Sequence, residues 1–459
     1  MSGSAPDRSS PPPSAELRAV ELPELEAFRL DNGLRVLVGE DHRLPEVSLR
    51  LIVEAGASAD PAGHEGAAEL TGRLLTEGAA GRGAQEVAAW LDRLGASFSV
   101  SAGYDVTILS LHLLSDVLDG GLDVLRAVAR EPSFAEAEVD RVRQERLDEI
   151  DRDRDKPEVA ADHTLIRAVF GDHRYGTPSA GLRESVEGLG REEVASFHGG
   201  RYGPPGAALV ACGDVDPGVL LEAVEERFGS WEGGRGRAVP PQPAPPAGPG
   251  PRVLLVDRPD SAQAELRLGT VGAAYGDETF FALLVGNAIL GGLFNSRINM
   301  NLREEKGWTY GARTSFHFRR VAGPFVGRTA VETAAAADAL AEFVREMEGM
   351  VGHPPTNEEM TLARNSLVLS LPRQFETVSQ VTRKITTQVV YGLPRAYWER
   401  YRERIEGVTR DDVVRAMGRF MEPEALRLVV VGRAAELEGR LAERFDRVEV
   451  VGPPGQRLA

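Results

Sequence analysis

Residue types that commonly carry metal or nucleophilic chemistry are sparse in this sequence. Two imidazoles three or four residues apart would share one face of a helix and could hold a metal ion, but the eight histidines include no such pair. The single cysteine, Cys212, excludes an internal disulfide, and the apolar run around it, AALVAC, predicts a buried structural thiol. No G-x-x-x-x-G-K-[ST] phosphate loop and no G-x-S-x-G nucleophile turn occurs. Local motifs therefore predict no common metal, nucleotide or serine-hydrolase site.

One predicted helix contains the acidic segment RLDEI, with Asp148 and Glu149. Its apolar residues recur three or four positions apart, which predicts the helix. Carboxylates without imidazoles form a weak metal site, and charge runs on helices usually face solvent. A solvated acidic helix is the simpler interpretation of these two residues.

The bulk composition bounds the class of protein. A chain of 459 residues with 42% hydrophobic content can bury a full core, and its length suits about two to four domains. Its formal charge of -17 repels nucleic acid and anionic membrane surfaces. No run approaches the roughly 18 apolar residues that span a bilayer, and the start lacks a basic segment followed by an apolar stretch. We therefore expect a soluble, cytoplasmic protein with neither nucleic acid nor membrane as a partner.

Two stretches of low complexity divide the chain. Residues 1–22 are rich in Ser and Pro and are expected to be disordered. Residues 233–250 combine Pro and Gly, which excludes helix and sheet interiors and predicts a semi-extended linker. Two halves of similar size remain, residues 23–232 and residues 251–452.

The two halves look like copies of one unit. Near its end each half repeats the order helix, buried strand, Gly turn and amphipathic helix, and the pairs Val194 with Val413 and Gly213 with Gly432 share one offset in sequence. Each half opens with strands: FRLDNGLRVLVGE carries an Asn-Gly hairpin turn, and RVLLVDRP with AELRLGTVG resembles it. Long helical patterns follow, including residues 84–95, residues 114–128 and AEVDRVRQERLDEIDRDRD. The expected fold class is α+β, with a sheet and helices on one of its faces in each half.

Ordered motifs run through both halves. In the first half they are GLRVLVGEDHRLPEVSLRLIVEAGA, GAAELTGRLLTEGA, LDRLGASFSVSAGYDVTILSL, HRYGTP and CGDVDP, and in the second half GGLFNSRINMNLREEKGWTYGA. Together they resemble the pitrilysin/insulinase-type (M16) metallopeptidase family, over nearly everything from about Phe28 to Val451. The resemblance implies two homologous M16-type α/β domains, joined by the Pro/Gly-rich linker, that form a clam-shell around a chamber for extended peptides.

Active members of that family carry an inverted zinc motif, H-x-x-E-H, together with a distal Glu on a later helix. Two imidazoles on one helical face hold the zinc, and the carboxylate between them acts as base. Aligning GAAELTGRLLTEGA with this pattern puts Glu69, Gly72 and Arg73 at the His, Glu and His positions. Gly72 has no side chain to deprotonate water, and Arg73 cannot lose its proton to become a ligand. We therefore expect no metal, no cofactor and no hydrolysis by this site.

Arg73 is predicted to occupy the vacated metal position. Glu69 lies four residues earlier on the same helix, in the favourable Glu-to-Arg order, and Asp148 or Glu149 supplies the region of the distal carboxylate. We expect Arg73 to form ion pairs with both. An Arg73 side chain that points into bulk solvent would contradict this.

The C-terminal signature LREEKGWTYGA holds the strongest functional lead. In two-subunit bacterial M16 peptidases, the subunit without the zinc motif supplies an Arg and a Tyr from this segment to its partner's active site, and the matching residues are Arg303 and Tyr310. A guanidinium and a phenol can donate hydrogen bonds to a scissile carbonyl as its oxygen gains charge. From spacing alone, an Arg paired with a nearby Glu and a Tyr packed in the core remain the alternative.

Two further features are candidates for contact with peptide. The resemblance places Gly291 and Gly292 in a glycine-rich segment that borders the chamber, although a turn between helices is an equal interpretation. An exposed strand edge in the first half could bind a peptide through main-chain hydrogen bonds. The sequence does not reveal which edge is open.

These features predict a catalytically inactive M16 subunit that forms a heterodimer with a zinc-bearing M16 subunit carrying an intact H-x-x-E-H motif. It would bind unstructured peptide and lend Arg303 and Tyr310 in trans, while the zinc lies in the partner. Two alternatives stand beside this. One is a structural scaffold, like the core proteins of the respiratory bc1 complex, and the other is a peptide- or leader-binding module without a peptidase role.

Overall fold

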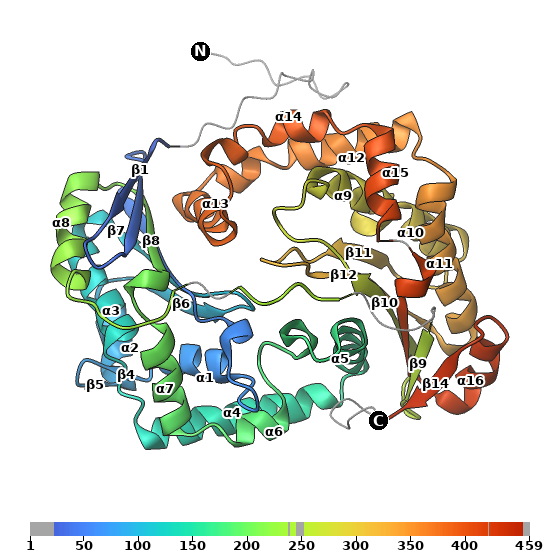
Figure 1. Cartoon of the computed structure of the whole chain (residues 1–459), viewed down its shortest axis with the longest axis horizontal. Helices are drawn as coiled ribbons and strands as arrows, with labels where there is room; N and C mark the ends of the chain where they lie inside the picture. The colour runs from blue at the N-terminus through green and yellow to red at the C-terminus, as the bar shows by residue number, and fades with distance from the viewer. Residues whose placement is uncertain (1–22, 237–238, 245–251, 421, 453–459) are drawn as a thin grey trace, which may run out of the picture.

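Each half of the chain folds around one six-stranded sheet (Figure 1). The computed structural model describes residues 23–236, 239–244, 252–420 and 422–452. The first half contains β1 (Leu25–Arg29), β2 (Arg35–Glu40), β3 (Glu46–Val53), β6 (Ser97–Ala102), β7 (Thr107–Leu114) and β8 (Ala207–Gly213), with a small ribbon of β4 (Gly78–Ala79) and β5 (Arg82–Gly83). The second contains β9 (Arg252–Asp257), β10 (Gln263–Val271), β11 (Ala312–Phe316), β12 (Pro324–Glu332), β13 (Arg427–Gly432) and β14 (Val448–Val451).

The two sheets repeat one topology, in the orders β1-β2-β8-β3-β7-β6 and β11-β12-β10-β13-β9-β14. In each, a late central strand, β8 or β13, runs parallel to an early strand and antiparallel to the next. Gly213 and Gly432 end these two central strands, as the shared offset predicts. The outermost strands differ, because β1 is antiparallel to β2 whereas β14 comes from the far end of the chain and is parallel to β9. The repeated topology agrees with a duplicated unit.

The Asn-Gly hairpin of the first half is confirmed. β1 and β2 pair antiparallel, and Gly33 at the turn has a φ of 97°, a conformation that favours glycine. Asn32 accepts a hydrogen bond from the Leu34 N–H at 3.1 Å and donates to the Phe228 carbonyl at 2.6 Å, which ties the turn to the end of the first half. The likeness predicted for the second half is wrong in one respect. Its two opening strands, β9 and β10, form no hairpin, because β13 lies between them.

Helices follow the predicted patterns closely. The first half has α1 (Ala67–Leu74), α2 (Ala84–Arg93), α3 (Leu118–Arg130), α4 (Glu136–Arg154), α5 (Pro157–Phe170), α6 (Arg183–Glu187), α7 (Arg191–Arg201) and α8 (Pro217–Phe228). The second has α9 (Phe280–Asn287), α10 (Arg297–Asn299), α11 (Ala336–Gly352), α12 (Asn357–Leu369), α13 (Val378–Tyr391), α14 (Tyr401–Glu406), α15 (Arg410–Gly418) and α16 (Ala434–Ala442), with π-helical turns η5 (Ala288–Gly292) and η6 (Met300–Glu305). The helix predicted over residues 114–128 starts late, because its first residues form a 3-10 turn after β7.

The two halves exchange one helix each (Figure 1). α5 of the first half packs on β10 and β13 of the second sheet, and α13 of the second half packs on β3 and β8 of the first sheet. Alternate residues of the central strands face opposite sides: Leu428 and Val430 belong to the second domain's own core, whereas Val429 and Val431 pack with α5 residues such as Leu165. Within each half, helices therefore cover one face of the sheet, as predicted. The other face of each sheet is covered by a helix of the other half.

A buried ion pair adds to this interlock. Arg320 of the second half forks onto Glu54 of the first, with nitrogen–oxygen distances of 2.6 and 2.9 Å. Both side chains are buried, at 3% and 9% exposure. A charge pair this deep would be left uncompensated if the halves separated. The two domains are therefore held together by more than the linker.

Some predicted boundaries lie outside the described residues. The predicted disordered tail, residues 1–22, is one of these. The predicted linker over residues 233–250 is described at 233–236 and 239–244, and those positions carry no helix or strand. The bounds of the linker and of the two domains stay predictions.

One helical run of the second domain is strongly apolar. Phe280–Glu305 is long and apolar enough by composition to cross a membrane, with a mean hydropathy of 1.3, yet 61% of its most apolar window is buried inside the fold. Its apolar residues, including Leu283 and Leu290, belong to the core of the second domain. Packing within the domain accounts for its composition.

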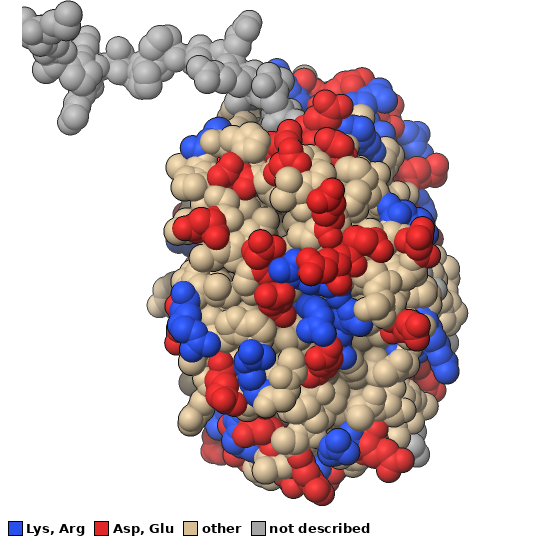
Figure 2. Space-filling view, turned by 90° about the vertical axis from the view of Figure 1, so that its left-hand side faces the viewer, with Lys and Arg blue, Asp and Glu red and all other residues tan. Residues whose placement is uncertain are grey.

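Charged residues are mixed on the face that Figure 2 shows. Acidic and basic side chains alternate there, so the net charge of -17 does not gather on that face into a patch of one sign. The face offers no broad basic surface for a polyanion.

Candidate functional site

The helix that carries the zinc-motif positions, α1, is fixed at its start by a buried carboxylate. Asp60 accepts hydrogen bonds from the backbone N–H groups of Gly66 and Ala68, each at 2.8 Å. Burial raises the pKa of Asp60 to about 7, and Arg174 lies 3.9 Å from its carboxylate. Because both Asp60 oxygens hold the helix N-terminus, the direction of α1 is set before the zinc-motif positions are reached.

The guanidinium of Arg73 lies at the position of the second histidine of the H-x-x-E-H motif. Its Nε donates to Glu69 at 2.8 Å, and its two terminal nitrogens donate to the two oxygens of Glu149 at 2.9 Å each. This two-pronged geometry is the strong form of an Arg–carboxylate pair. The hydrogen bonds to Glu149, and then those to Glu69, raise the pKa of Arg73. The predicted pairing of Arg73 is confirmed.

Of the two candidate distal carboxylates, only Glu149 belongs to this network. Asp148 accepts a hydrogen bond from Gln144 on the exposed face of α4, at 2.8 Å, so the interpretation as a solvated helix holds for Asp148 alone. Arg146, one turn before Glu149, donates to the same carboxylate at 2.9 Å. Hydrogen bonds from Arg73, followed by those from Arg146, lower the pKa of Glu149 to about 2. Glu149 is therefore ionised at neutral pH and held by two guanidinium groups.

Gly72, at the position of the general base, packs α1 against the first sheet. A Cβ atom at Gly72 would lie 3.3 Å from Val100 and 3.7 Å from Ala102, both on β6. A longer side chain would have to displace β6 by a few tenths of an ångström or more. The position therefore lacks the carboxylate and has little room for one.

These residues do not fit a zinc ion. A guanidinium, which only donates, stands where an imidazole would accept, and the Glu69 and Glu149 carboxylates are occupied by Arg73 and Arg146. Among the residues that the structure describes, no three His, Cys, Asp or Glu side chains are grouped so that they could hold a metal ion. What remains at this place is an ion-pair network that joins α1 to α4.

An open strand edge lies beside this network. In the described part of the first sheet, β6 pairs only with β7, and α1 packs against it. The residues of β6 alternate between exposed and half-buried, so one side of its backbone is available to an added strand. The first sheet therefore has two outermost strands, β1 and β6, and β6 is the one at the zinc-motif helix.

Arg303 is held loosely in the second domain. It lies on η6, where its guanidinium stacks over the Phe294 ring at 4.4 Å and its Nε is 3.5 Å from Glu304. Arg303 therefore does pair with a nearby Glu, as the alternative interpretation predicted, but the distance is long. π-helical turns such as η6 are rare in proteins overall, and those that occur are often at functional sites.

Tyr310 is 93% exposed, so the alternative in which it packs in the core is wrong. The loop that carries it is nevertheless fixed. Thr309 accepts a hydrogen bond from Thr329 of β12 at 2.9 Å and donates to the Gly311 carbonyl at 3.1 Å. Tyr310 is therefore presented to solvent from an anchored backbone.

The glycines of η5 differ from each other. A Cβ atom at the buried Gly291 would lie 2.5 Å from the hydroxyl and 2.7 Å from the backbone nitrogen of Thr314, so glycine lets η5 pack closely on β11. Gly292 is exposed, and a Cβ there would meet the Asn287 side chain at 2.8 Å. Close packing explains Gly291, and contact with peptide stays a prediction for both.

The structure does not bring the predicted residues into one site. Glu69, Gly72, Arg73 and Glu149 lie on α1 and α4 of the first domain, whereas Arg303 and Tyr310 lie between α10 and β11 of the second (Figure 1). Any joint action of the two sets within one active site would need a second chain. Sequence reasoning also missed Arg146 and Asp60. The three-residue spacing between Arg146 and Glu149 could have predicted the contact of Arg146. No sequence pattern indicated the role of Asp60.

Two family profiles match this architecture. The profile for insulinase (peptidase family M16) matches residues 35–181, and the profile for the peptidase M16 inactive domain matches residues 188–367. The chain belongs to the M16 peptidase family. The M16 assignment agrees with the two repeated domains and with the altered zinc motif.

Relatives of this M16 chain include proteins named as zinc proteases. An uncharacterized zinc protease of Mycobacterium tuberculosis is 29% identical over 412 residues, which cover 89% of this chain and 92% of that protein. One of Streptomyces coelicolor is 25% identical over 408 residues, or 88% of each chain. The likeness therefore spans both M16 domains.

Solved structures share the whole fold. A peptidase M16 inactive domain from Pseudomonas fluorescens superposes with a TM-score of 0.84 at 25% identity and covers 89% of this chain and 98% of that chain. A protease from Helicobacter pylori has the same fold, with a TM-score of 0.81 at 18% identity, over 90% of this chain and 100% of that chain. The paired arrangement of domains is therefore common to these proteins.

Proposed function

We propose that this chain is the non-catalytic subunit of a two-subunit M16 peptidase and assembles with a zinc-bearing M16 subunit that has an intact H-x-x-E-H motif. The observation that carries the proposal is the Arg73–Glu149 pair, which replaces the zinc site by an internal salt bridge. Cleavage by such an assembly takes place in the partner. The peptide chamber is formed by the two subunits together.

Arg303 and Tyr310 act in trans in this proposal. Their side chains donate hydrogen bonds to the carbonyl oxygen of the scissile peptide bond as it gains negative charge. Two features support this role: the Tyr310 side chain is 93% exposed, and the ion pair of Arg303 with Glu304 is long, at 3.5 Å. A guanidinium held by a ring contact and a long ion pair can change partners at small energetic cost.

The β6 edge contributes peptide binding. An extended peptide adds to β6 as a further strand, with main-chain hydrogen bonds that demand little of its sequence. The position of β6 beside α1 supports this, because a substrate on the equivalent edge of the partner would pass its zinc motif. In this chain the same edge binds peptide without cleaving it.

The test is co-expression with the M16 protein of a neighbouring reading frame that has an intact motif. The assembly should hydrolyse an unstructured peptide faster than the partner alone. Arg303→Ala and Tyr310→Phe should each lower kcat by on the order of a hundredfold, because each removes one donor to the oxyanion. Size-exclusion chromatography should show the heterodimer intact in both variants.

Arg313→Ala is the matched control, because Arg313 is an exposed arginine of the same segment on β11. It should leave the turnover unchanged. Unchanged turnover in the Arg303 and Tyr310 variants as well, with an intact assembly, would contradict the assisting role and favour a structural scaffold. Peptide binding without any M16 partner or turnover would favour the peptide-binding module.

A further inference from the structure

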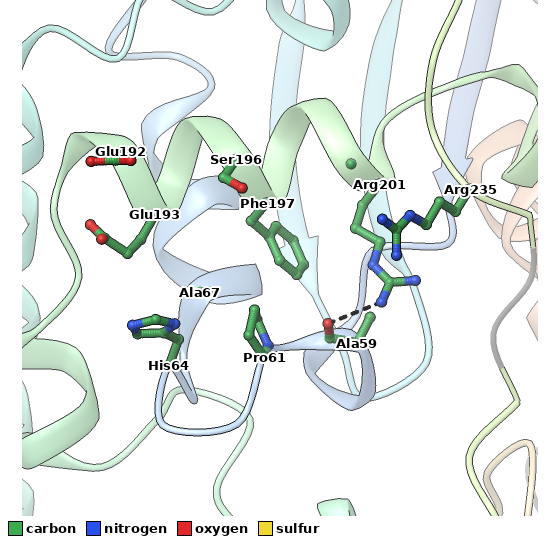
Figure 3. A pocket seen from close by; sticks show the side chains of 11 residues that line it. Ala59, Pro61, His64, Ala67, Glu192, Glu193, Ser196, Phe197, Arg201 and Arg235 are labelled. Atoms are coloured by element: carbon green, nitrogen blue, oxygen red, sulfur yellow. Dashed lines mark hydrogen bonds between the residues drawn. The ribbon is translucent and has the colours of Figure 1, made fainter.

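A groove of about 330 Å³ runs along α7, beside the start of α1. One wall is the face of α7 that carries Glu192, Glu193, Ser196, Phe197 and Arg201, and the other wall includes Ala59, Pro61 and His64 of the segment before α1, with Arg235 at one end (Figure 3). Neither the zinc-motif positions nor Arg303 and Tyr310 line it. The groove is therefore a separate candidate for binding.

The basic end of the groove holds two guanidinium groups without a carboxylate partner among the described residues. Arg201 makes one long hydrogen bond, to the Ala59 carbonyl at 3.3 Å, and Arg235 lies beside it (Figure 3). Burial, and then the charge of Arg235, lower the pKa of Arg201, whereas the charge of the Asp60 carboxylate acts in the opposite direction without an ion pair. Three other arginines of the first half, Arg73, Arg141 and Arg227, each contact carboxylates. Two neighbouring guanidinium groups that lack one are suited to a bound carboxylate.

The acidic end of the groove lies at the start of the same helix. Glu192 is exposed and makes no ion pair within the described residues. Glu193 caps α7 by accepting from the Gly190 N–H at 2.9 Å, and its carboxylate is half-buried at the wall of the groove near His64. Two carboxylates at one end of the groove are suited to a bound ammonium group.

The spacing of the two ends selects the length of a ligand. Glu193 and Arg201 stand at opposite ends of α7, and eight residues of helix at 1.5 Å each span about 12 Å. An extended peptide advances about 3.3 Å per residue, so three or four residues cover that span. Between the ends, Pro61 and Phe197 supply apolar contacts and Ser196 supplies a hydroxyl.

We propose that this groove binds a short free peptide of three or four residues, with its C-terminal carboxylate at Arg201 and Arg235 and its N-terminal ammonium at Glu192 and Glu193. The recognition is of two free termini at a fixed distance and is independent of the proposed role in trans. Apolar side chains in the middle of the peptide contact Pro61 and Phe197.

The test is isothermal titration of tetra-alanine into the isolated, purified chain. Loss of a charge-assisted contact should weaken binding by about tenfold or more, so N-acetyl-tetra-alanine and tetra-alanine amide should each bind at least that much more weakly. Arg201→Gln, Arg235→Gln and Glu192→Gln should reduce the affinity for tetra-alanine similarly. With the amide-capped peptide, the two arginine variants should lose little more.

Matched controls are Arg152→Gln and Glu222→Gln, which change the same charges on exposed positions of α4 and α8. They should bind as the unmodified chain does, and circular dichroism should show every variant folded. Equal affinity for free and capped peptides, no detectable binding at millimolar concentration, or acetate binding as tightly as the peptide would each overturn the proposal. None of these results depends on peptide hydrolysis.

Discussion

Arg73 makes a structural contact at a position where the zinc motif of the family has a histidine. Its guanidinium satisfies Glu69 and both oxygens of Glu149, two carboxylates that would otherwise face each other across α1 and α4. The side chains of Arg73 and Glu149 are about one-third exposed, so solvent screens part of their attraction. The contribution of this network to stability is therefore expected to lie between that of a surface ion pair and that of a fully buried one.

Arg73→Met should lower the free energy of unfolding by about 1–3 kcal/mol, because hydrogen bonds to charged groups are lost and two carboxylates remain without a counter-charge. Urea denaturation measures the change. Arg152→Met, an exposed arginine of α4 without a carboxylate contact in the described structure, should change stability by less than about 0.5 kcal/mol. Equal effects of the two substitutions would show that the Arg73 network adds nothing to stability.

The same pair predicts a dependence on pH. Because the pKa of Glu149 is lowered from 4.5 to about 2 in the folded chain, its stabilising contribution is complete above pH 4.5 and is lost as the pH falls toward 2. The difference in unfolding free energy between the unmodified chain and Glu149→Gln should therefore be constant near neutrality and shrink below pH 4.5. A difference that stays constant down to pH 3 would contradict the lowered pKa.

At the scale of elements, the exchange of α5 and α13 makes each sheet a sandwich between its own helices and one from the other half. Ile385 on α13 is 1% exposed in the cluster that includes Ile52 of β3 and Val210 of β8. Helices that cross between halves join two cores into one cooperative unit.

Ile385→Ala should destabilise the whole chain by about 2–5 kcal/mol, since it removes buried volume at the contact between the halves. Urea denaturation followed by tryptophan fluorescence, with Trp90 and Trp231 in the first half and Trp308 and Trp398 in the second, should show one transition at a lower urea concentration. Arg383→Ala, at an exposed position on the same helix, is the control. A change confined to the second half would contradict the proposed coupling.

Particular elements show what the sequence could and could not predict. The pairing of Arg73 followed from helix spacing, and the Asn-Gly turn predicted its hairpin, because both depend on residues near in sequence or on one helix face. The burial of β8 on both faces was visible in the run AALVAC, but which helix covers the second face depends on contacts between distant segments. The exposure of Tyr310 and the open edge of β6 likewise depend on tertiary arrangement.

At the scale of the whole molecule, contacts outside the linker join the two halves. The exchanged helices and the buried Arg320–Glu54 pair join them independently of residues 233–250. A protease site introduced at residues 239–244 should therefore give two fragments that still co-elute on native size-exclusion chromatography and separate only in denaturant. Fragments that separate without denaturant would show that the linker is required.

The account depends most on α1 having lost the ability to bind zinc. The direct measurement is the zinc content of the isolated chain by inductively coupled plasma mass spectrometry after incubation with zinc and dialysis. The unmodified chain should retain far less than one zinc per chain. A variant with Glu69→His and Arg73→His, which restores the two imidazoles opposite Glu149 and keeps Gly72, serves as the comparison. One tightly held zinc per unmodified chain, with peptidase activity that a chelator abolishes, would contradict the account.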